Sequence, residues 1–162
     1  MSFKMDEEQI RAFIEEWTWG TIIAVDGDRP YAIEVSYGSD GKHIYFGSRP
    51  GGTMAKCIKK NPNIIFKICD ADKHYATWRA VSVIGKAERL TKREDIIYGM
   101  KVIANRVIHS SKKDSVTEAQ FVAIGEKLAD KPELGGLLRI AIENLSGRHR
   151  LKPLDLSYAT AG

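Results

Sequence analysis

Residues 44–70 read IYFGSRPGGTMAKCIKKNPNIIFKICD, and this stretch decides the expected fold. The IYF run at its start and the IIFKIC run near its end predict two strands. Between them, a glycine-rich turn leads into a short helix over residues 53–60, which the sequence Asn61-Pro62-Asn63 ends. Backbone N–H groups at such a helix start, with hydroxyls and a cation nearby, suit a bound phosphate. The turn alone does not identify a ligand, so its meaning depends on the elements around it.

The flanking sequence predicts an antiparallel barrel with helices beside it. Short strands separated by glycine-containing turns are expected over residues 21–25, 29–37 and 43–46, and they form a meander. Further strands are expected over residues 64–69, over 75–90 with a bend at Gly85, and over 137–145 with an extension to Arg150. Helices are expected after the capping residue Asp6, after Leu90 and over residues 117–128, with a polar break over 109–115. The fold class is therefore mainly β with flanking helices, in a six-stranded antiparallel barrel.

Composition limits the possible functions. The 162 residues are most simply one domain, residues 1–162, with a net charge of +4. No dense basic run with interleaved aromatic residues is present, which argues against nucleic-acid binding. No apolar run approaches the length of a membrane span, and the N-terminus is unlike a signal peptide. With Cys57 and Cys69 read as reduced thiols, we expect a soluble, cytoplasmic protein.

The sequence contains no recognisable catalytic constellation. Its four histidines have no metal-ligand spacing, so no metal is expected, and no nucleophile motif surrounds a serine or threonine. Glu34 interrupts a strand and either contacts a ligand or is solvated. Arg79 either meets a phosphate or a partner subunit, or forms a surface salt bridge. Cys57 is expected to be a packed apolar thiol.

Four segments in this order resemble a known family. RPYAIEVSY, GKHIYFGS, GGTMAKCIKKNPNIIF and SVIGKAERL together resemble the pyridoxamine 5'-phosphate oxidase-like, FMN-binding split-barrel proteins, particularly small bacterial members related to nitroimidazole-resistance proteins. The resemblance implies a six-stranded split barrel that works as a homodimer, with FMN bound at two sites between the subunits.

The resemblance also implies which residues contact the flavin. By position, the strand residues along the flavin are Tyr31, Ala32, Ile33 and Glu34, and those over its ring and ribityl chain are Phe46, Gly47 and Ser48. The phosphate turn contains Gly52, Thr53 and Met54, with Lys56 one helical turn along, and the next strand contributes Arg79, Val81 and Ser82.

This chain departs from the family pattern at three places. Family members usually carry two basic residues at the positions of Thr53 and Met54, and many small relatives carry a histidine at the position of Gly47. A basic residue that the oxidases carry near Ser36 is missing. The phosphate is therefore expected to depend on backbone N–H groups and Thr53, with Arg49, Lys56 or Arg79 nearby.

The implied activity is that of an FMN-dependent oxidoreductase or reductase acting on an unidentified small molecule, with a nicotinamide as a possible electron donor. The alternative is a non-catalytic flavin-binding module, or a split barrel whose cofactor site is lost or altered. Oxidation of pyridoxamine phosphate is not expected, because the oxidases' C-terminal substrate-binding signature is not recognisable in LKPLDLSYATAG.

Overall fold

Three consecutive strands form the centre of the sheet. In the computed structural model, which describes residues 1–110 and 116–151, β2 (Trp19–Asp26), β3 (Arg29–Ser39) and β4 (His43–Gly47) pair antiparallel in chain order. Gly27 has a φ of 67°, in the left-handed region that the tight turn between β2 and β3 requires. The predicted meander is confirmed.

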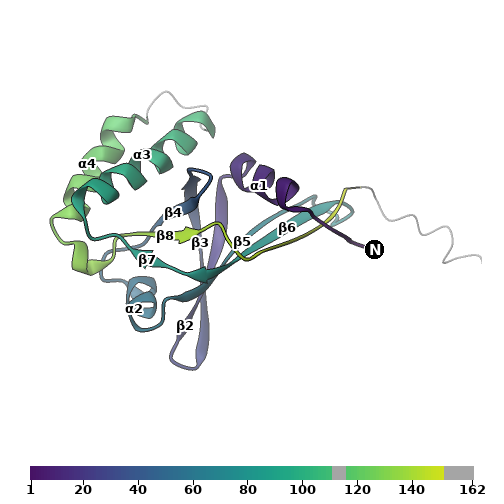
Figure 1. Cartoon of the computed structure of the whole chain (residues 1–162), viewed down its shortest axis with the longest axis horizontal. Coiled ribbons are helices and arrows are strands. Elements are labelled where there is room, and N and C mark those ends of the chain that lie inside the picture. The colour runs from purple at the N-terminus through teal and green to yellow at the C-terminus, as the bar shows by residue number, and fades with distance from the viewer. Residues whose placement is uncertain (111–115, 152–162) are drawn as a thin grey trace, which may run out of the picture.

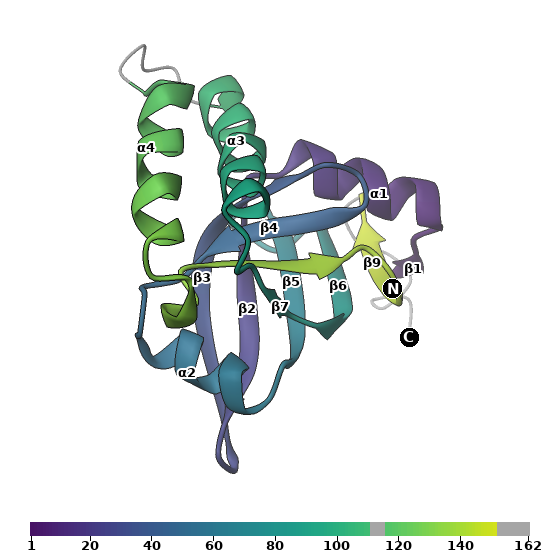
Figure 2. The ribbon, with the colours of Figure 1, turned by 60° about the vertical axis from the view of Figure 1, so that its left-hand side comes forward.

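The other strands extend the meander on both sides. They are β5 (Asn63–Ala71), β6 (Trp78–Lys86), β7 (Glu88–Arg89), β8 (Leu137–Ala141), β9 (Leu145–Arg150) and β1 (Phe3–Lys4). The order across the sheet is β1-β9-β6-β5-β2-β3-β4-β8-β7, so β1 and β7 remain at opposite edges. The sheet curls without closing, as Figure 2 shows. The predicted antiparallel split barrel is confirmed, although the described part of the chain contains nine strands, because β1 is an additional short edge strand and two of the six predicted strands are each divided in two.

The strand expected over residues 75–90 is shorter and is interrupted. It begins at Trp78, because the preceding loop closes on Asp72, whose carboxylate accepts hydrogen bonds from the N–H groups of His74 and Thr77. It ends at Lys86, and the N–H of Ala87 donates to the Pro62 carbonyl at 2.8 Å. The chain then continues as β7, which pairs with β8 instead of β5. The break therefore moves the chain from one half of the sheet to the other.

The prediction of one strand over residues 137–145 is wrong. Strand β8 pairs with β4, whereas β9 pairs with β6 on the other half of the sheet. Between them, Asn144 adopts a left-handed φ of 43°, and the N–H of Ile142 donates to the Lys42 carbonyl at 2.8 Å. This turn ends one pairing and begins another.

Helices α1 (Glu7–Glu16) and α2 (Thr53–Lys60) pack against the main core. Asp6 caps α1 as predicted: its carboxylate accepts from the Gln9 N–H at 2.8 Å, and the Gln9 side chain accepts from the Asp6 N–H at 3.0 Å. The bounds of α2 match the prediction. Cys57 on α2 is a buried member of the core, as expected, and burial raises the pKa of its thiol.

Helices α3 (Arg93–Ser110) and α4 (Glu118–Ala129) form a hairpin over the β3–β4–β8 side of the sheet (Figure 1). A second apolar cluster lies beneath them and contains Tyr45, Leu90, Ile96, Met100, Ile103 and Leu137. At Gly38 the β3 backbone meets α3 so closely that an added Cβ would lie 2.5 Å from the Val102 carbonyl oxygen. A 3-10 turn, η1 (Pro132–Leu134), returns the chain to β8. Most of the polar break predicted over 109–115 lies outside the described residues, as does the chain after Leu151.

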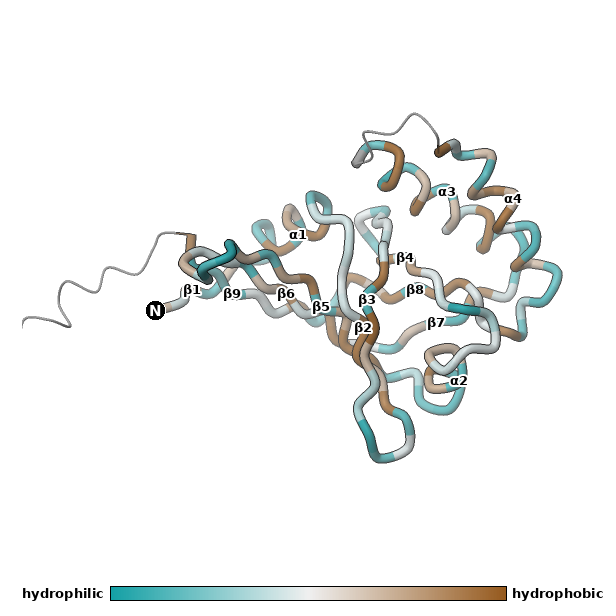
Figure 3. The backbone as a smooth tube through the Cα atoms, turned by 180° about the vertical axis from the view of Figure 1, so that it is seen from behind, coloured by the Kyte–Doolittle hydropathy of each residue, from teal (hydrophilic) through white to brown (hydrophobic). Residues whose placement is uncertain are grey.

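The hydropathy of the backbone follows this arrangement. In Figure 3, apolar stretches run along the central strands and along α3 and α4, while the turn between β2 and β3 is hydrophilic. Among the described residues, no helix has the length and apolar character needed to span a membrane.

Candidate functional site

Strand β3 presents its predicted site residues to two different faces. Tyr31 and Ile33 are half-buried and pack against the core, whereas Ala32, Glu34 and Ser36 are exposed on the outer face of the sheet. This alternation follows from strand geometry. Of the four predicted β3 residues, two can therefore contact a molecule on the outer face directly.

The turn after β4 is fastened to the segment that follows η1. The Ser48 N–H donates to the Gly136 carbonyl at 3.0 Å, and the Ser48 hydroxyl donates to the Gly135 carbonyl at 2.8 Å. The Gly51 N–H donates to the Leu134 carbonyl at 2.8 Å. Phe46, predicted to lie over the flavin ring, is completely buried in the core. The hydrogen bonds from Ser48 and Gly51 hold the turn in place. They also occupy the N–H groups of these two residues, which are then not available to a ligand.

The first turn of α2 retains donors with no acceptor among the described residues. The amides of Thr53, Met54 and Ala55 are helix-start N–H groups, which have no intrahelical partner. The N-cap residue is Gly52, which provides no side chain to accept from them. No acidic residue occupies this turn, so nothing there offsets the positive end of the helix dipole. The arrangement suits an anion.

The side chains around the start of α2 divide into accessible and buried groups. Thr53, Arg49 and Lys56 are exposed. Met54 is only 3% exposed and belongs to the core, so its side chain points away from this site. We call residues 48–55 the α2 start.

Arg79 is held by partners inside the chain. Its guanidinium forms two bonds with the Glu16 carboxylate, at 2.8 and 3.1 Å, and a third with Asp70 at 2.9 Å. It also lies 4.2 Å from the centre of the Phe13 ring. The hydrogen bond from Arg79 lowers the pKa of Glu16, although burial opposes this shift. The salt bridge named among the alternatives is therefore present, and Glu16 and Asp70 occupy the Arg79 guanidinium.

The outer face of the sheet carries a row of apolar side chains. Strand pairing aligns Ala32 with Ile23, Ile23 with Ile65, and Ile65 with Ile84. Ile84 is 42% exposed, and the row borders a hollow of about 480 Å³. Ser82 belongs to the neighbouring row, beside Lys67. Ala32 and Ile84 are exposed, whereas Ile23 and Ile65 are half-buried. Partly exposed apolar groups gathered on one face commonly bind another molecule.

A second hollow, of about 390 Å³, lies where the α3–α4 hairpin covers the outer face. Its floor is formed by β3 and the end of β4, through Val35, Ser36, Gly47 and Ser48. Its walls come mainly from the two helices, through Met100, Ile103, Phe121, Ile124 and Leu128. We call this space the hairpin hollow. Sequence analysis did not identify the helix residues, although the spacing of Phe121, Ile124 and Leu128 marks an apolar stripe on α4.

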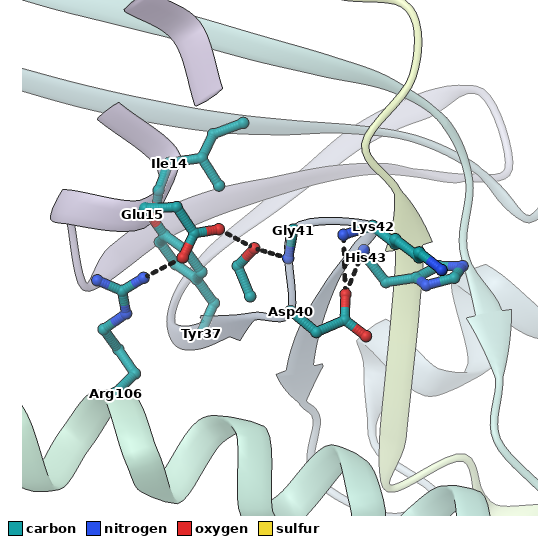
Figure 4. A network of polar contacts seen from close by, with 9 residues as sticks. Ile14, Glu15, Tyr37, Asp40, Gly41, Lys42, His43 and Arg106 are labelled. Atoms are coloured by element: carbon teal, nitrogen blue, oxygen red, sulfur yellow. Dashed lines mark hydrogen bonds and ion pairs between the residues drawn. The ribbon is translucent and has the colours of Figure 1, made fainter. Parts of the chain in front are cut away.

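A larger hollow of about 820 Å³ lies between α1 and the β3–β4 hairpin. Polar side chains around it form hydrogen bonds and ion pairs with one another (Figure 4). The Tyr37 hydroxyl donates to the Ile14 carbonyl at 2.7 Å, and the Ser39 hydroxyl donates to Glu15, which also accepts from Arg106 at 3.1 Å. We call Glu15, Tyr37, Ser39, Asp40 and Arg106 the hairpin network. This network is named for the β3–β4 hairpin, and it joins that hairpin to α1 and α3. It is separate from the hairpin hollow, which lies under the α3–α4 hairpin.

Asp40 is the acceptor that organises the hairpin itself. Its carboxylate accepts from the N–H groups of Lys42 and His43 at 2.9 and 2.7 Å. The hydroxyls of Tyr45 and Tyr98 donate to its other oxygen at 3.2 and 3.1 Å. Burial tends to raise the pKa of Asp40, but these four hydrogen bonds outweigh it and hold the pKa below its ordinary value.

Within residues 1–110 and 116–151, no group of three or more histidine, cysteine or acidic side chains is placed to bind a metal ion. Three accessible surfaces of the described chain suit binding: the α2 start suits an anion, the outer face an apolar body, and the hairpin hollow a small molecule.

Comparison with known proteins gives the same fold. A model of the family described as pyridoxamine 5'-phosphate oxidase matches residues 6–149. A flavocytochrome, Anf3 from Azotobacter vinelandii, superposes with a TM-score of 0.70 at 15% identity, covering 99% of this chain and 76% of that one. An FAD-binding protein from Mesorhizobium loti gives a TM-score of 0.67 at 17% identity, covering 93% and 99%.

A third similar structure is a proposed 5-nitroimidazole antibiotic resistance protein from Bacteroides thetaiotaomicron, with a TM-score of 0.67 at 14% identity, covering 92% of this chain and 87% of that one. No curated protein sequence matches the chain. At these identities, the similar structures show the fold alone.

Proposed function

Because the chain belongs to the pyridoxamine 5'-phosphate oxidase family, we propose that it binds FMN between two copies of itself and acts as an oxidoreductase on a small molecule. The observation that carries this proposal is the α2 start, where three unpaired helix N–H groups lie beside an exposed hydroxyl and two exposed cations. This donor set suits a phosphate.

The predicted contacts that remain accessible have defined parts in this proposal. The amides of residues 53–55 and the Thr53 hydroxyl bind the phosphate, with Arg49 and Lys56 supplying positive charge. Ala32 and Glu34 on β3 border the body of the flavin. A bound flavin supplies two-electron transfer, so the protein needs no nucleophile of its own. The chain's residues bind and orient the cofactor, and exclude water from one of its faces.

The outer face of the sheet supports the homodimer. In the single chain, Ala32 and Ile84 of this row are exposed and Ile23 and Ile65 are half-buried, so a second copy would remove the row from water. Ala32 belongs both to this row and to the strand proposed to border the flavin. Dimer formation and flavin binding therefore use adjoining parts of one surface.

A second candidate is a flavin-binding module without catalysis. It is favoured by the scarcity of fixed positive charge at the α2 start, since Met54 is buried and Arg79 is engaged by Glu16 and Asp70. Reduction separates the two candidates. An oxidoreductase should lose its flavin absorbance when a nicotinamide donor is added and regain it with an acceptor, whereas a binding module should keep it.

The phosphate contact is tested with three ligands: FMN, FAD and riboflavin, which lacks the phosphate. Binding is measured by quenching of flavin fluorescence. We expect FMN to bind more tightly than riboflavin. Thr53→Glu should lower FMN affinity by roughly tenfold or more, because one charge-assisted contact contributes about 1.5–3 kcal/mol, and it should leave riboflavin affinity almost unchanged.

Thr91→Glu is the matched control, because it makes the same substitution at another exposed threonine. It should bind FMN like the unmodified chain. If the unmodified chain bound FMN and riboflavin with equal affinity, the α2 start would not be the phosphate-binding site. Failure to bind any of the three flavins would overturn the proposed function.

The dimer is tested by sedimentation. Ile84→Lys places a charge in the apolar row and should convert the dimer to a monomer. Ile124→Lys makes the same change at a similarly exposed isoleucine on α4, 48% exposed against 42%, and should leave the dimer intact. A monomeric unmodified chain, or a dimer unaffected by Ile84→Lys, would contradict the proposed interface.

A further inference from the structure

The hairpin hollow adjoins the proposed flavin surface but has a different chemistry. We propose that it binds the substrate of the flavin, and that this substrate is an uncharged, largely apolar small molecule with a hydrogen-bond acceptor. This inference rests on the proposed function, because only a bound flavin makes an occupant of this space a substrate.

The lining of the hollow carries no charge. Its walls consist of aliphatic, aromatic and thioether side chains from α3 and α4, including Met100, Phe121 and Leu128. Its polar side chains are the hydroxyls of Ser36 and Ser48 in the floor. An anion bound there would lose its water without gaining a cationic partner, at a cost of several kcal/mol. The lining therefore favours neutral molecules and discriminates against phosphates and carboxylates.

The two serines have different roles. The Ser48 hydroxyl already donates its proton to the Gly135 carbonyl, so toward a ligand it can only accept. The Ser36 hydroxyl has no hydrogen-bond partner among the described residues, and it can donate. A carbonyl or comparable acceptor on an otherwise apolar ring would satisfy Ser36. This is why the proposed substrate carries an acceptor.

The hollow adjoins the strand that is proposed to border the flavin. Ser36 continues the exposed side of β3 beyond Ala32 and Glu34. Ser36 and Gly47 are each next in sequence to a member of the Tyr37–Phe46 pair, and both line the hollow. Gly47 leaves the floor open: a Cβ added there would meet only the Gly136 carbonyl oxygen, at 3.8 Å. The volume of about 390 Å³ falls within the range of small-molecule sites, roughly 300–1,000 Å³.

The preference of the hairpin hollow for neutral molecules is tested with two probes that differ mainly in charge, 2-naphthamide and 2-naphthoate. Both have one apolar bicyclic ring and a carbonyl oxygen, but only the second is an anion at neutral pH. Their binding to FMN-loaded protein is measured by calorimetry. We expect 2-naphthamide to bind at least about tenfold more tightly, since burying an unpaired charge is costly.

A substitution at the mouth of the hollow should reverse this preference. Ile124 lines the hollow and is nearly half exposed, so Ile124→Arg brings a guanidinium to its mouth without burying it in the core. Affinity for 2-naphthoate should rise about tenfold, and affinity for 2-naphthamide should fall. Ala123→Arg adds the same charge at the adjacent exposed position of α4, which does not line the hollow, and should keep the original preference.

The outcomes separate this inference from the proposed function. Equal or tighter binding of 2-naphthoate to the unmodified protein, no binding of either probe, or equal effects of Ile124→Arg and Ala123→Arg would overturn the inference even if FMN binds. If FMN fails to bind, the same titrations on the flavin-free protein still test the lining. A neutral preference would then remain, but the role as a flavin substrate site would be lost.

Discussion

The β3–β4 hairpin and the α2 start lie at opposite ends of β4, and both are turns that contain glycines and hydroxyl groups. In the hairpin network, donors and acceptors find partners within the chain, from α1, from α3 and from the hairpin itself. At the α2 start, three amides and the side chain of Arg49 have no partner among the described residues. The difference indicates which polar groups hold the fold together and which are left for a ligand. It can be tested by making the same substitution in both regions.

The largest contrast is expected from replacing glycine by alanine at Gly38, in β3 next to the hairpin turn, and at Gly47, the residue just before the α2 start. Gly38→Ala should lower the free energy of unfolding by about 2–3 kcal/mol, because its Cβ would lie 2.5 Å from the Val102 carbonyl oxygen and α3 would have to move. Gly47→Ala should change it by less than about 0.5 kcal/mol, since its Cβ meets only one atom, at 3.8 Å. Urea denaturation of both variants measures the difference.

Similar losses of unfolding free energy in Gly38→Ala and Gly47→Ala would contradict this contrast. The turn after β4 would then be packed as tightly as the hairpin, with little space for a ligand. Gly47→Ala should also leave the circular dichroism of the chain unchanged.

The second contrast concerns an acceptor and a free hydroxyl. Asp40→Ala should destabilise the protein by about 1–2 kcal/mol at neutral pH, because it removes the acceptor for two backbone amides and two tyrosine hydroxyls. Thr53→Ala should have almost no effect on unfolding, because Thr53 makes no hydrogen bond that the fold requires.

The effect of Asp40→Ala should depend on pH. The pKa of Asp40 is held below its ordinary value of 3.8, so between the two values the unfolded chain binds the proton and the folded chain does not. The stability contributed by Asp40 is therefore complete well above pH 3.8 and is lost as the pH falls through the lowered pKa. Denaturation curves of the two proteins should converge in acid. A difference that stays constant down to pH 2 would show that Asp40 does not act through its charge.

The elements that sequence reasoning predicted are those whose causes are local. Asp6 and Gln9 lie three residues apart and complete a capping box, so α1 could be predicted from adjacent residues. The break at Ala87 could not, because it depends on an N–H that finds the Pro62 carbonyl 25 residues earlier in the chain. The division between β8 and β9 has the same origin, since each pairs with a strand distant in sequence.

The candidate site follows the same rule. Strand geometry requires adjacent residues of β3 to face opposite sides, but it does not specify which side becomes the outer face. Arg79 could not be assigned from the sequence, because its partners Glu16 and Asp70 come from different elements. The walls of the hairpin hollow depend on where α3 and α4 dock, which no short segment specifies.

The smallest contrast in stability is expected between two arginines. Arg106 contacts Glu15 at 3.1 Å and joins α3 to α1, whereas the Arg49 side chain has no partner among the described residues. Arg106→Gln should lower the free energy of unfolding by about 0.5 kcal/mol, with the loss shrinking in 1 M salt, as partly exposed ion pairs do. Arg49→Gln should leave unfolding unchanged but weaken FMN binding several-fold, without affecting riboflavin. If Arg49→Gln destabilised the fold as much as Arg106→Gln, Arg49 would stabilise the fold. If it weakened the binding of FMN and riboflavin equally, Arg49 would contact the flavin ring. In either case, the phosphate would have to be bound by the helix amides and Lys56.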